Sequence, residues 1–287
     1  FDHGQGVWLW DKEGHKYLDA LAGIAVNSVG HAHPRLVRAI ADQASKLIHC
    51  SNYFNIDLQE QVAEKLVEHS GLEAVFFCNS GLEANECAIK IARKFGHAKG
   101  IEVPNIIVLK HAFHGRSIAT LSATGNPSVR ADFSPYTEGF IFVDESDLDG
   151  IRKIVEENKN VVAIFFEPIL GEGGVVPIDL SVIKGIREIC NEHDLLMMCD
   201  EVQCGMGRSG KWFAHQWAEI KPDVITMAKG LAGGVPVGAV IVSEKANIFK
   251  PGNHGSTFGG NPLAMRAALE TLSIIEDEKL VENAFEV

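Results

Sequence analysis

Apolar residues recur along this chain with two periods, one typical of helices and the other typical of buried strands. In the segment 81–97, apolar side chains at positions 84, 87, 88, 91, 92 and 95 share one helical face. The helical period predicts helices at 34–49, 57–69, 81–97, 147–158, 180–193 and 262–277. Short apolar runs predict strands at 73–78, 105–109, 139–143, 161–166, 195–199, 223–227 and 238–242. Because several strand-to-strand connections contain a helix, we expect an α/β fold with a mainly parallel seven-stranded sheet, covered on both faces.

The two ends of the chain lie outside this alternation of strands and helices. The run 7–19 has the pattern of a hairpin that turns at Glu13-Gly14. After the helix that begins at Asn261-Pro262, the chain continues for only about ten residues without another strand pattern. We therefore expect three parts: part of an N-terminal small subdomain (1–54), a large domain (55–275) and the start of a C-terminal small domain that is otherwise absent (276–287).

Composition and charge narrow the classes of partner. The chain has 287 residues, is 46% hydrophobic and carries a formal net charge of −12, which argues against nucleic acids and anionic membranes. It contains no apolar run of membrane-spanning length and does not begin like a signal peptide. Six cysteines without a C-x-x-C pair predict buried free thiols in a reducing cytoplasm. The His31-Ala32-His33 cluster has no further ligand at suitable spacing, so we expect no metal site there but a helix that begins at Pro34.

Two predicted strands end in complementary charged groups. The run 195–199 leads into Asp200, and Lys229 follows shortly after the run 223–227. Because open α/β sheets bind ligands at the carboxyl ends of their strands, we expect both residues at one edge. Pyridoxal 5'-phosphate (PLP) requires such a pair: an amine that holds it as a Schiff base, and a carboxylate that keeps its ring nitrogen protonated. Taken singly, each residue is equally well explained as a surface charge.

An anion site is predicted where the strand 73–78 turns through Asn79-Ser80-Gly81 into a helix. Free backbone N–H groups and the positive end of the helix dipole attract a phosphate there. Ser80 and Glu83 also have the spacing of a capping box, so a well-capped helix without a ligand is an equal alternative. Since the net charge repels anions, a phosphate has to be bound by local donors.

Seven stretches together carry a resemblance to a known family. They are GIAVNSVGH (23–31), FCNSGLEANE (77–86), AFHGRS (112–117), EPILGEGGV (167–175), DEVQCGMGR (200–208), AKG (228–230) and HGSTFGGNP (254–262). In this order, over nearly the whole chain, they resemble the class III (ω-amino) aminotransferases. These are PLP enzymes of fold type I, built like aspartate aminotransferase. The resemblance implies a homodimer with shared active sites.

The resemblance also implies how the cofactor is held. Lys229 would bind PLP covalently and shuttle a proton, and Asp200 would pair with the ring nitrogen. Val202 and Phe113 would pack on the two faces of the ring, and Gln203 would contact its hydroxyl. The phosphate would be held by Ser80, Gly81 and Leu82, with Thr257 contributed by the partner subunit. From the sequence alone, Phe113 is an ordinary core aromatic residue.

For the substrate, the resemblance implies three contacts. Arg116 would bind a carboxylate through its two-pronged guanidinium group, although a surface arginine is the alternative. Glu172 would pair with a second substrate-binding arginine that the family carries in its C-terminal domain, which this sequence lacks. Ser256 would be a further substrate contact.

The implied reaction is transamination between a small-molecule amino donor and 2-oxoglutarate. The expected donor is N-acetylornithine, as in arginine biosynthesis. Ornithine, succinylornithine, succinyl-diaminopimelate and a carrier-linked lysine are alternatives. Two further alternatives are an aminomutase or decarboxylase on the same cofactor scaffold, and a truncated chain that binds PLP without turnover.

Overall fold

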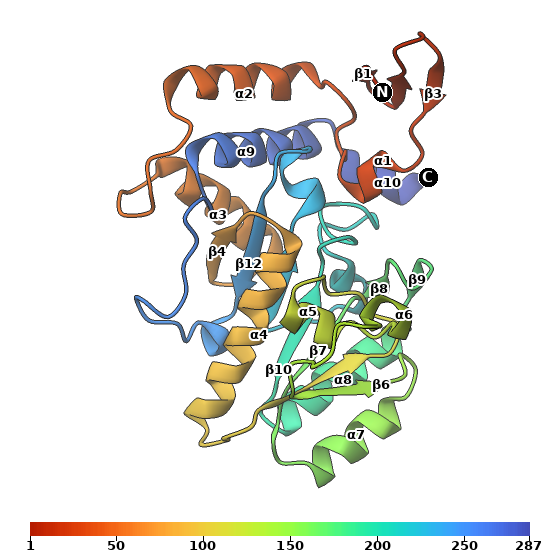
Figure 1. Cartoon of the computed structure of the whole chain (residues 1–287), viewed down its shortest axis with the longest axis vertical. Helices are drawn as coiled ribbons and strands as arrows, with labels where there is room; N and C mark the ends of the chain where they lie inside the picture. The colour runs from red at the N-terminus through yellow and green to blue at the C-terminus, as the bar shows by residue number, and fades with distance from the viewer.

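A seven-stranded sheet forms the centre of the computed structural model, which describes all residues from 1 to 287 (Figure 1). Its strands are β4 (Ala74–Cys78), β5 (Asn105–Leu109), β6 (Phe140–Val143), β7 (Val161–Phe166), β10 (Leu196–Asp200), β11 (Val224–Met227) and β12 (Gly238–Val242). Across the sheet the order is β4-β12-β11-β10-β7-β5-β6, and only β12 runs antiparallel to its neighbours. The predicted α/β fold is confirmed, and each predicted strand is found within one residue of its expected bounds.

Alternation along each strand divides the core between the two faces of the sheet. On one face, residues such as Val108 and Phe165 pack against α4 (Gly81–Ala98). On the other face, their neighbours pack against α7 (Leu148–Glu157) and α8 (Leu180–Glu192). Toward β12, this second face is covered by α3 (Asp57–Ser70) and α9 (Pro262–Asp277). Burial on both sides explains why the strands are continuous apolar runs rather than alternating ones.

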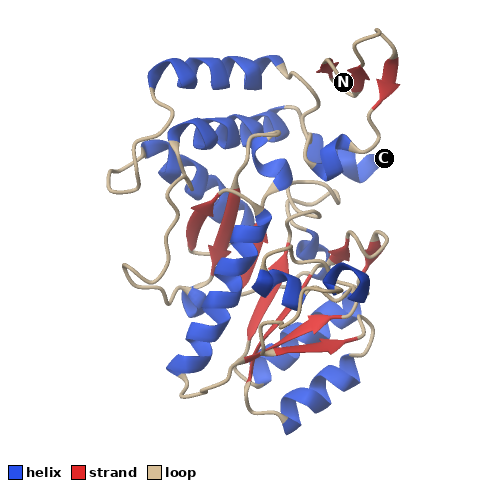
Figure 2. Ribbon diagram, viewed as in Figure 1, coloured by secondary structure: helices blue, strands red, loops and turns tan.

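The helix α2 (Pro34–Lys46) shows one correction to the prediction. It begins at Pro34 as expected, with His33 in the N-cap position, and packs alongside α9 (Figure 2). It ends before the predicted boundary at residue 49, because Leu47 is extended with φ −161°. The other predicted helices are confirmed with small shifts at their ends.

The N-terminal segment contains more structure than the sequence predicted. The expected hairpin is formed by β2 (Trp8–Trp10) and β3 (Lys16–Leu18), and β1 (His3–Gln5) adds a third strand. The following turn, α1 (Ala22–Ala25), is left-handed, with φ between 50° and 66° at all four residues. Asp19 holds this turn: one carboxylate oxygen accepts the N–H groups of residues 21 and 22, and the other lies 2.7 Å from His31 Nε2.

Short elements complete the chain. They are α5 (Ile118–Ala123), α6 (Pro127–Arg130), β8 (Ile169–Leu170), β9 (Val176–Pro177), η1 (Ala214–Ala218), η2 (Lys229–Ala232), η3 (Glu244–Ala246) and α10 (Leu280–Glu286). All six cysteines are free, as predicted, and all except Cys50 are buried. No helix combines the length and the apolar character needed to cross a bilayer. The division at residues 54 and 275 stays a prediction.

At the amino ends of β10 and β11, Asp223 joins several elements. Its carboxylate accepts from the Arg187 guanidinium on α8 at 2.8 Å, from the Met197 N–H at 2.9 Å and from the Ser243 hydroxyl at 3.4 Å. This end of the sheet lies opposite the carboxyl ends that carry Asp200 and Lys229.

Asp223→Asn should therefore lower the free energy of unfolding by roughly 1–3 kcal/mol, because an amide replaces a buried acceptor of three hydrogen bonds. Urea denaturation measures the loss. As a control, Lys221→Ala removes an exposed ion pair to Glu73 and should cost less than about 1 kcal/mol. Equal effects of the two substitutions would contradict the structural role of Asp223.

Candidate active site

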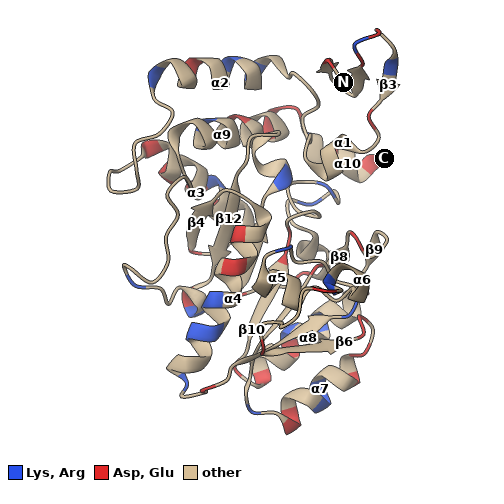
Figure 3. Ribbon diagram, viewed as in Figure 1, with Lys and Arg blue, Asp and Glu red and all other residues tan.

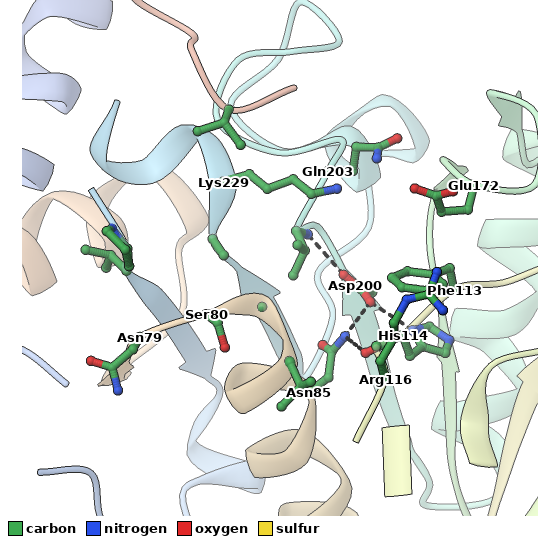
Figure 4. Close-up of a pocket in the computed structure, with 18 of the residues that line it drawn as sticks. Asn79, Ser80, Asn85, Phe113, His114, Arg116, Glu172, Asp200, Gln203 and Lys229 are labelled. Atoms are coloured by element: carbon green, nitrogen blue, oxygen red, sulfur yellow. Dashed lines mark hydrogen bonds and ion pairs between the residues drawn. The ribbon is translucent and has the colours of Figure 1, made fainter. Parts of the chain in front are cut away.

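A cavity of about 480 Å³ lies at the carboxyl ends of the parallel strands (Figure 4). It brings together most of the residues that the sequence singled out. Its walls include Ser80, Gly81, Leu82, Phe113, Arg116, Glu172, Asp200, Val202, Gln203 and Lys229. Ser256 and Thr257 do not line it.

Asp200 is the buried charge at the base of this cavity, with 3% of its surface exposed. Its Oδ2 atom accepts from Asn85 Nδ2 at 2.7 Å and lies 2.8 Å from His114 Nδ1. Its Oδ1 atom accepts only the Val202 N–H, at 3.0 Å. Since a carboxylate oxygen can accept about two hydrogen bonds, Oδ1 can accept one more donor.

Asn85 and His114 were not identified as site residues from the sequence. Asn85 Nδ2 also donates to the His114 carbonyl oxygen at 2.8 Å, so the two residues brace each other as well as Asp200. The His114 ring is fully buried and stacks on Phe165, with ring centroids 4.1 Å apart. For Asn85, the available signal was a polar residue on the buried side of the helix 81–97. His114 lies inside the stretch 112–117 but has no special spacing.

Lys229 follows β11 and extends toward Gln203 and Asp200 (Figure 4). Its backbone has a left-handed φ of 43°, a conformation that costs a residue with a side chain on the order of 1–3 kcal/mol. Burial lowers the pKa of its amine, and the negative charges of Asp200, Glu167 and Glu172 oppose that shift. A larger fraction of the amine is therefore neutral near pH 7 than for an exposed lysine.

The N-terminus of α4 forms the predicted anion site. Ser80 Oγ accepts the Glu83 N–H at 3.2 Å, whereas the N–H groups of Gly81 and Leu82 have no partner within the helix. The predicted capping box is only partly formed, because the Glu83 carboxylate accepts from the Asn79 N–H rather than from that of Ser80. A Cβ atom on Gly81 would lie 2.6 Å from Val202 Cγ1, so only glycine allows this close approach. Along α4, acidic residues precede basic ones, which complements the helix dipole (Figure 3).

Two loops supply the side chains at the opening of the cavity. In the loop after β5, the exposed Arg116 lies with its guanidinium carbon 5.6 Å from the centroid of the Phe113 ring. In the loop after β7, Glu172 is also exposed. Beneath them, the buried Glu167, which the sequence analysis assigned no role, also lines the cavity.

Ser256 and Thr257 line a second hollow of about 940 Å³, together with residues 51–56. Ser256 Oγ accepts from Asn79 Nδ2 at 3.2 Å and from the Gly259 N–H at 2.9 Å. Thr257 is exposed. Asn79 lines the first cavity and, through this hydrogen bond, also contacts the loop that carries Ser256 and Thr257.

Comparisons with known proteins agree with one another. The profile of the family "Aminotransferase class-III" matches residues 1–287. The chain is 55% identical to the acetylornithine aminotransferase of Nitrosomonas europaea, over 99% of this chain and 72% of that protein. It is 50% identical to the acetylornithine aminotransferase of Synechocystis, over 98% of this chain and 67% of that protein.

Solved structures with the same fold include two enzymes of related name. The ornithine aminotransferase from Toxoplasma gondii superposes with a TM-score of 0.93 at 37% identity, covering 97% of this chain and 67% of that one. The N-acetylornithine aminotransferase from Stenotrophomonas maltophilia superposes with a TM-score of 0.83 at 38% identity, covering 98% of this chain and 70% of that one.

The environment of Lys229 predicts an unusually reactive amine. In protein freed of any bound cofactor and treated with trace acetic anhydride at neutral pH, Lys229 should be acetylated several-fold faster than the exposed Lys12. A pKa lowered by one unit raises the neutral fraction of an amine about tenfold. As the pH rises through the ordinary pKa of an exposed lysine, Lys12 also becomes neutral and this advantage should disappear. Mass spectrometry of competing peptides measures both rates, and a Lys229 that reacts no faster than Lys12 would contradict the expectation.

Proposed function

The chain belongs to the class-III aminotransferases, a family of PLP enzymes. We propose that it catalyses a transamination with N-acetylornithine as the amino donor. The reaction moves the δ-amino group of N-acetylornithine to 2-oxoglutarate, giving N-acetylglutamate semialdehyde and glutamate. Lys229 and Asp200 in one cavity support the reaction class. The choice of donor is carried by one observation: relatives 50–55% identical over nearly the whole chain are acetylornithine aminotransferases.

The residues of the cavity fit PLP. Asp200 Oδ1 has a free acceptor position for the ring nitrogen, and the unpaired N–H groups at the start of α4 suit a phosphate. We propose that Ser80, Gly81 and Leu82 hold the phosphate, Val202 and Phe113 cover the ring, Gln203 contacts its hydroxyl, and Lys229 attaches it. When bound, the cofactor supplies an electron sink for the carbon that bears the amino group.

Asp200 keeps this sink effective because its negative charge holds the ring nitrogen protonated. Asn85 and His114 fix the orientation of that carboxylate through Oδ2, and burial strengthens its electrostatic effect. Lys229 Nζ is the base that takes the proton from the reacting carbon and later returns it. Its lowered pKa suits this role, since a neutral amine is needed to accept a proton near pH 7.

Arg116 is proposed to bind the carboxylate that both substrates carry. Its guanidinium group is exposed at the cavity, and no carboxylate of the chain forms an ion pair with it. Bidentate binding there would orient the donor amine toward the centre of the cavity. Glu172, on the facing loop, is proposed to pair with a cationic group and to release it when one substrate replaces the other.

Ornithine is the second candidate donor, favoured by the likeness to the ornithine aminotransferase structure. The two donors differ in the α-amino group, which is acetylated and neutral in one and charged in the other. The five buried free thiols support a reducing compartment, and we propose the cytoplasm.

A panel of amines tests the function. Purified PLP-loaded protein is mixed with N-acetylornithine, ornithine, succinylornithine or 4-aminobutyrate, and conversion of the cofactor to its amine form is followed by absorbance. N-acetylornithine should react with the highest kcat/KM, and Lys229→Ala should show no conversion. Faster reaction with ornithine would replace the donor, and no reaction with any amine would reject the transamination.

We also propose a homodimer in which Thr257 reaches the phosphate of the neighbouring subunit. The position of Thr257 outside the cavity of its own chain supports this arrangement. So do the exposed aromatic residues around it: Tyr53, Phe54 and Phe258 are 96%, 69% and 62% exposed. Exposed aromatic clusters of this kind are typical of protein interfaces. In a two-fold dimer the exchange is reciprocal.

Subunit mixing tests the shared site. Thr257→Ala and Lys229→Ala should each be impaired alone. After subunit exchange, a heterodimer contains one site with both residues intact, so activity should return. If confirmed heterodimers stay as inactive as the separate variants, Thr257 does not act in the neighbouring subunit.

A further inference from the structure

We propose that Glu167 is a positioning residue that clamps together the two loops at the opening of the cavity. It follows β7 directly and is 5% exposed. Its Oε1 atom accepts the Phe113 N–H at 2.8 Å, and its Oε2 atom accepts the Gly171 N–H at 3.1 Å. One carboxylate therefore binds the backbone of both loops.

The two bonds lie next to the side chains that face a substrate. Phe113 is three residues before Arg116, and its ring lies beneath the Arg116 guanidinium group. Gly171 immediately precedes Glu172. Fixing these two amides limits how far the cationic and anionic side chains can move relative to each other.

Between the loops 110–117 and 167–175, the Phe113–Glu167 bond is the only hydrogen bond. The loop after β7 is also held from its other side, because Gly171 packs so closely on Gln203 that a Cβ atom would collide with its amide. Glu167 thus connects the Phe113 loop to the turn at Gly171, which already packs against Gln203, the residue proposed to contact the cofactor hydroxyl.

The cost of burying Glu167 also favours a role beyond packing. Burial raises the pKa of Glu167 to about 7, with a further contribution from the charge of Asp200, while His114 and the two backbone bonds act in the opposite direction. An apolar side chain would avoid this cost but could not accept the two N–H groups.

The consequence for catalysis rests on the proposed transamination, in which one cavity has to accept two substrates in turn. A clamp at its opening keeps the Arg116 and Glu172 loops in one arrangement for both half-reactions. Glu167 acts through the loops and needs no contact with either substrate.

Hydrogen–deuterium exchange on cofactor-free protein tests the clamp without relying on activity. In Glu167→Gln, amides in at least one of the segments 111–115 and 169–173 should exchange about tenfold faster, because an amide side chain can accept only one of the two N–H groups. Asp223→Asn is the matched control: it also converts a buried carboxylate to an amide, but at the opposite edge of the sheet. It should leave exchange in both loops unchanged.

Kinetics provide the second measurement. Glu167→Gln should lower kcat/KM about tenfold in the half-reaction with the amino donor and equally in that with 2-oxoglutarate. Faster exchange in either loop of a protein that transaminates no amine would retain the clamp and reject the proposed function. Unchanged exchange in both loops, or the same change in Asp223→Asn, would overturn the clamp whatever the activity. If Glu167→Gln does not fold, Glu167→Asp keeps the charge but is too short to reach both amides, and the same exchange pattern is expected.

Discussion

The arrangement of this site depends on the burial of one negative charge, that of Asp200. An ionised carboxylate in a protein interior is stable only when hydrogen-bond donors surround it. Here the donors come from three separate places: Asn85 on α4, His114 after β5 and the backbone of Val202. To supply them, α4 has to lie across the carboxyl end of β10, and the loop after β5 has to turn inward. The same placement sets the N-terminus of α4 at the cavity.

The end of β10 carries two adjacent buried acids: Asp200 faces the cavity, and Glu201 holds neighbouring segments of the fold together. Glu201 is also buried, but its carboxylate accepts the N–H groups of Ala214 and His215, lies 2.9 Å from His215 Nδ1, and is 3.2 Å from Cys204 Sγ. All of these partners belong to the scaffold, and Glu201 does not line the cavity. Successive side chains of an extended chain point to opposite sides, which explains why adjacent acids have different surroundings.

The site is also connected to the outer surface of the chain. Asn79 lines the cavity, its side chain is held by Glu83, and its amide reaches Ser256 in the glycine-rich loop. The proposed cofactor site and the loop proposed to enter the neighbouring subunit therefore share a contact.

The sequence by itself determined the sheet, the main helices and the pair of Asp200 and Lys229 at one edge. Apolar periodicity reports burial, and the strand bounds and most helix bounds follow from it because both faces of the sheet are covered. The motifs predicted ten of the cavity residues through their resemblance to the family, whereas residue patterns alone placed only Asp200, Lys229 and the turn at Ser80-Gly81 there. Short elements such as 118–123 were missed because one helical turn or two cannot display a period. The left-handed backbone at Ala22, Ile24, Ala25 and Lys229 was missed because these residue types do not favour it.

Only the tertiary structure decided which residues hold the site in place. Asn85 and Asp200 are 115 positions apart in the chain, and His114 is also far from Asp200 in sequence. No local pattern encodes such contacts. The same holds for Glu167, which binds Phe113 across 54 positions and is otherwise just an acid after an apolar strand. Thr257 was placed outside the cavity of its own chain by the path of the glycine-rich loop, which residue types do not specify. The sequence specifies the chemistry of each side chain. The partners of a buried charge, however, are determined by packing between elements that meet only after the chain has folded.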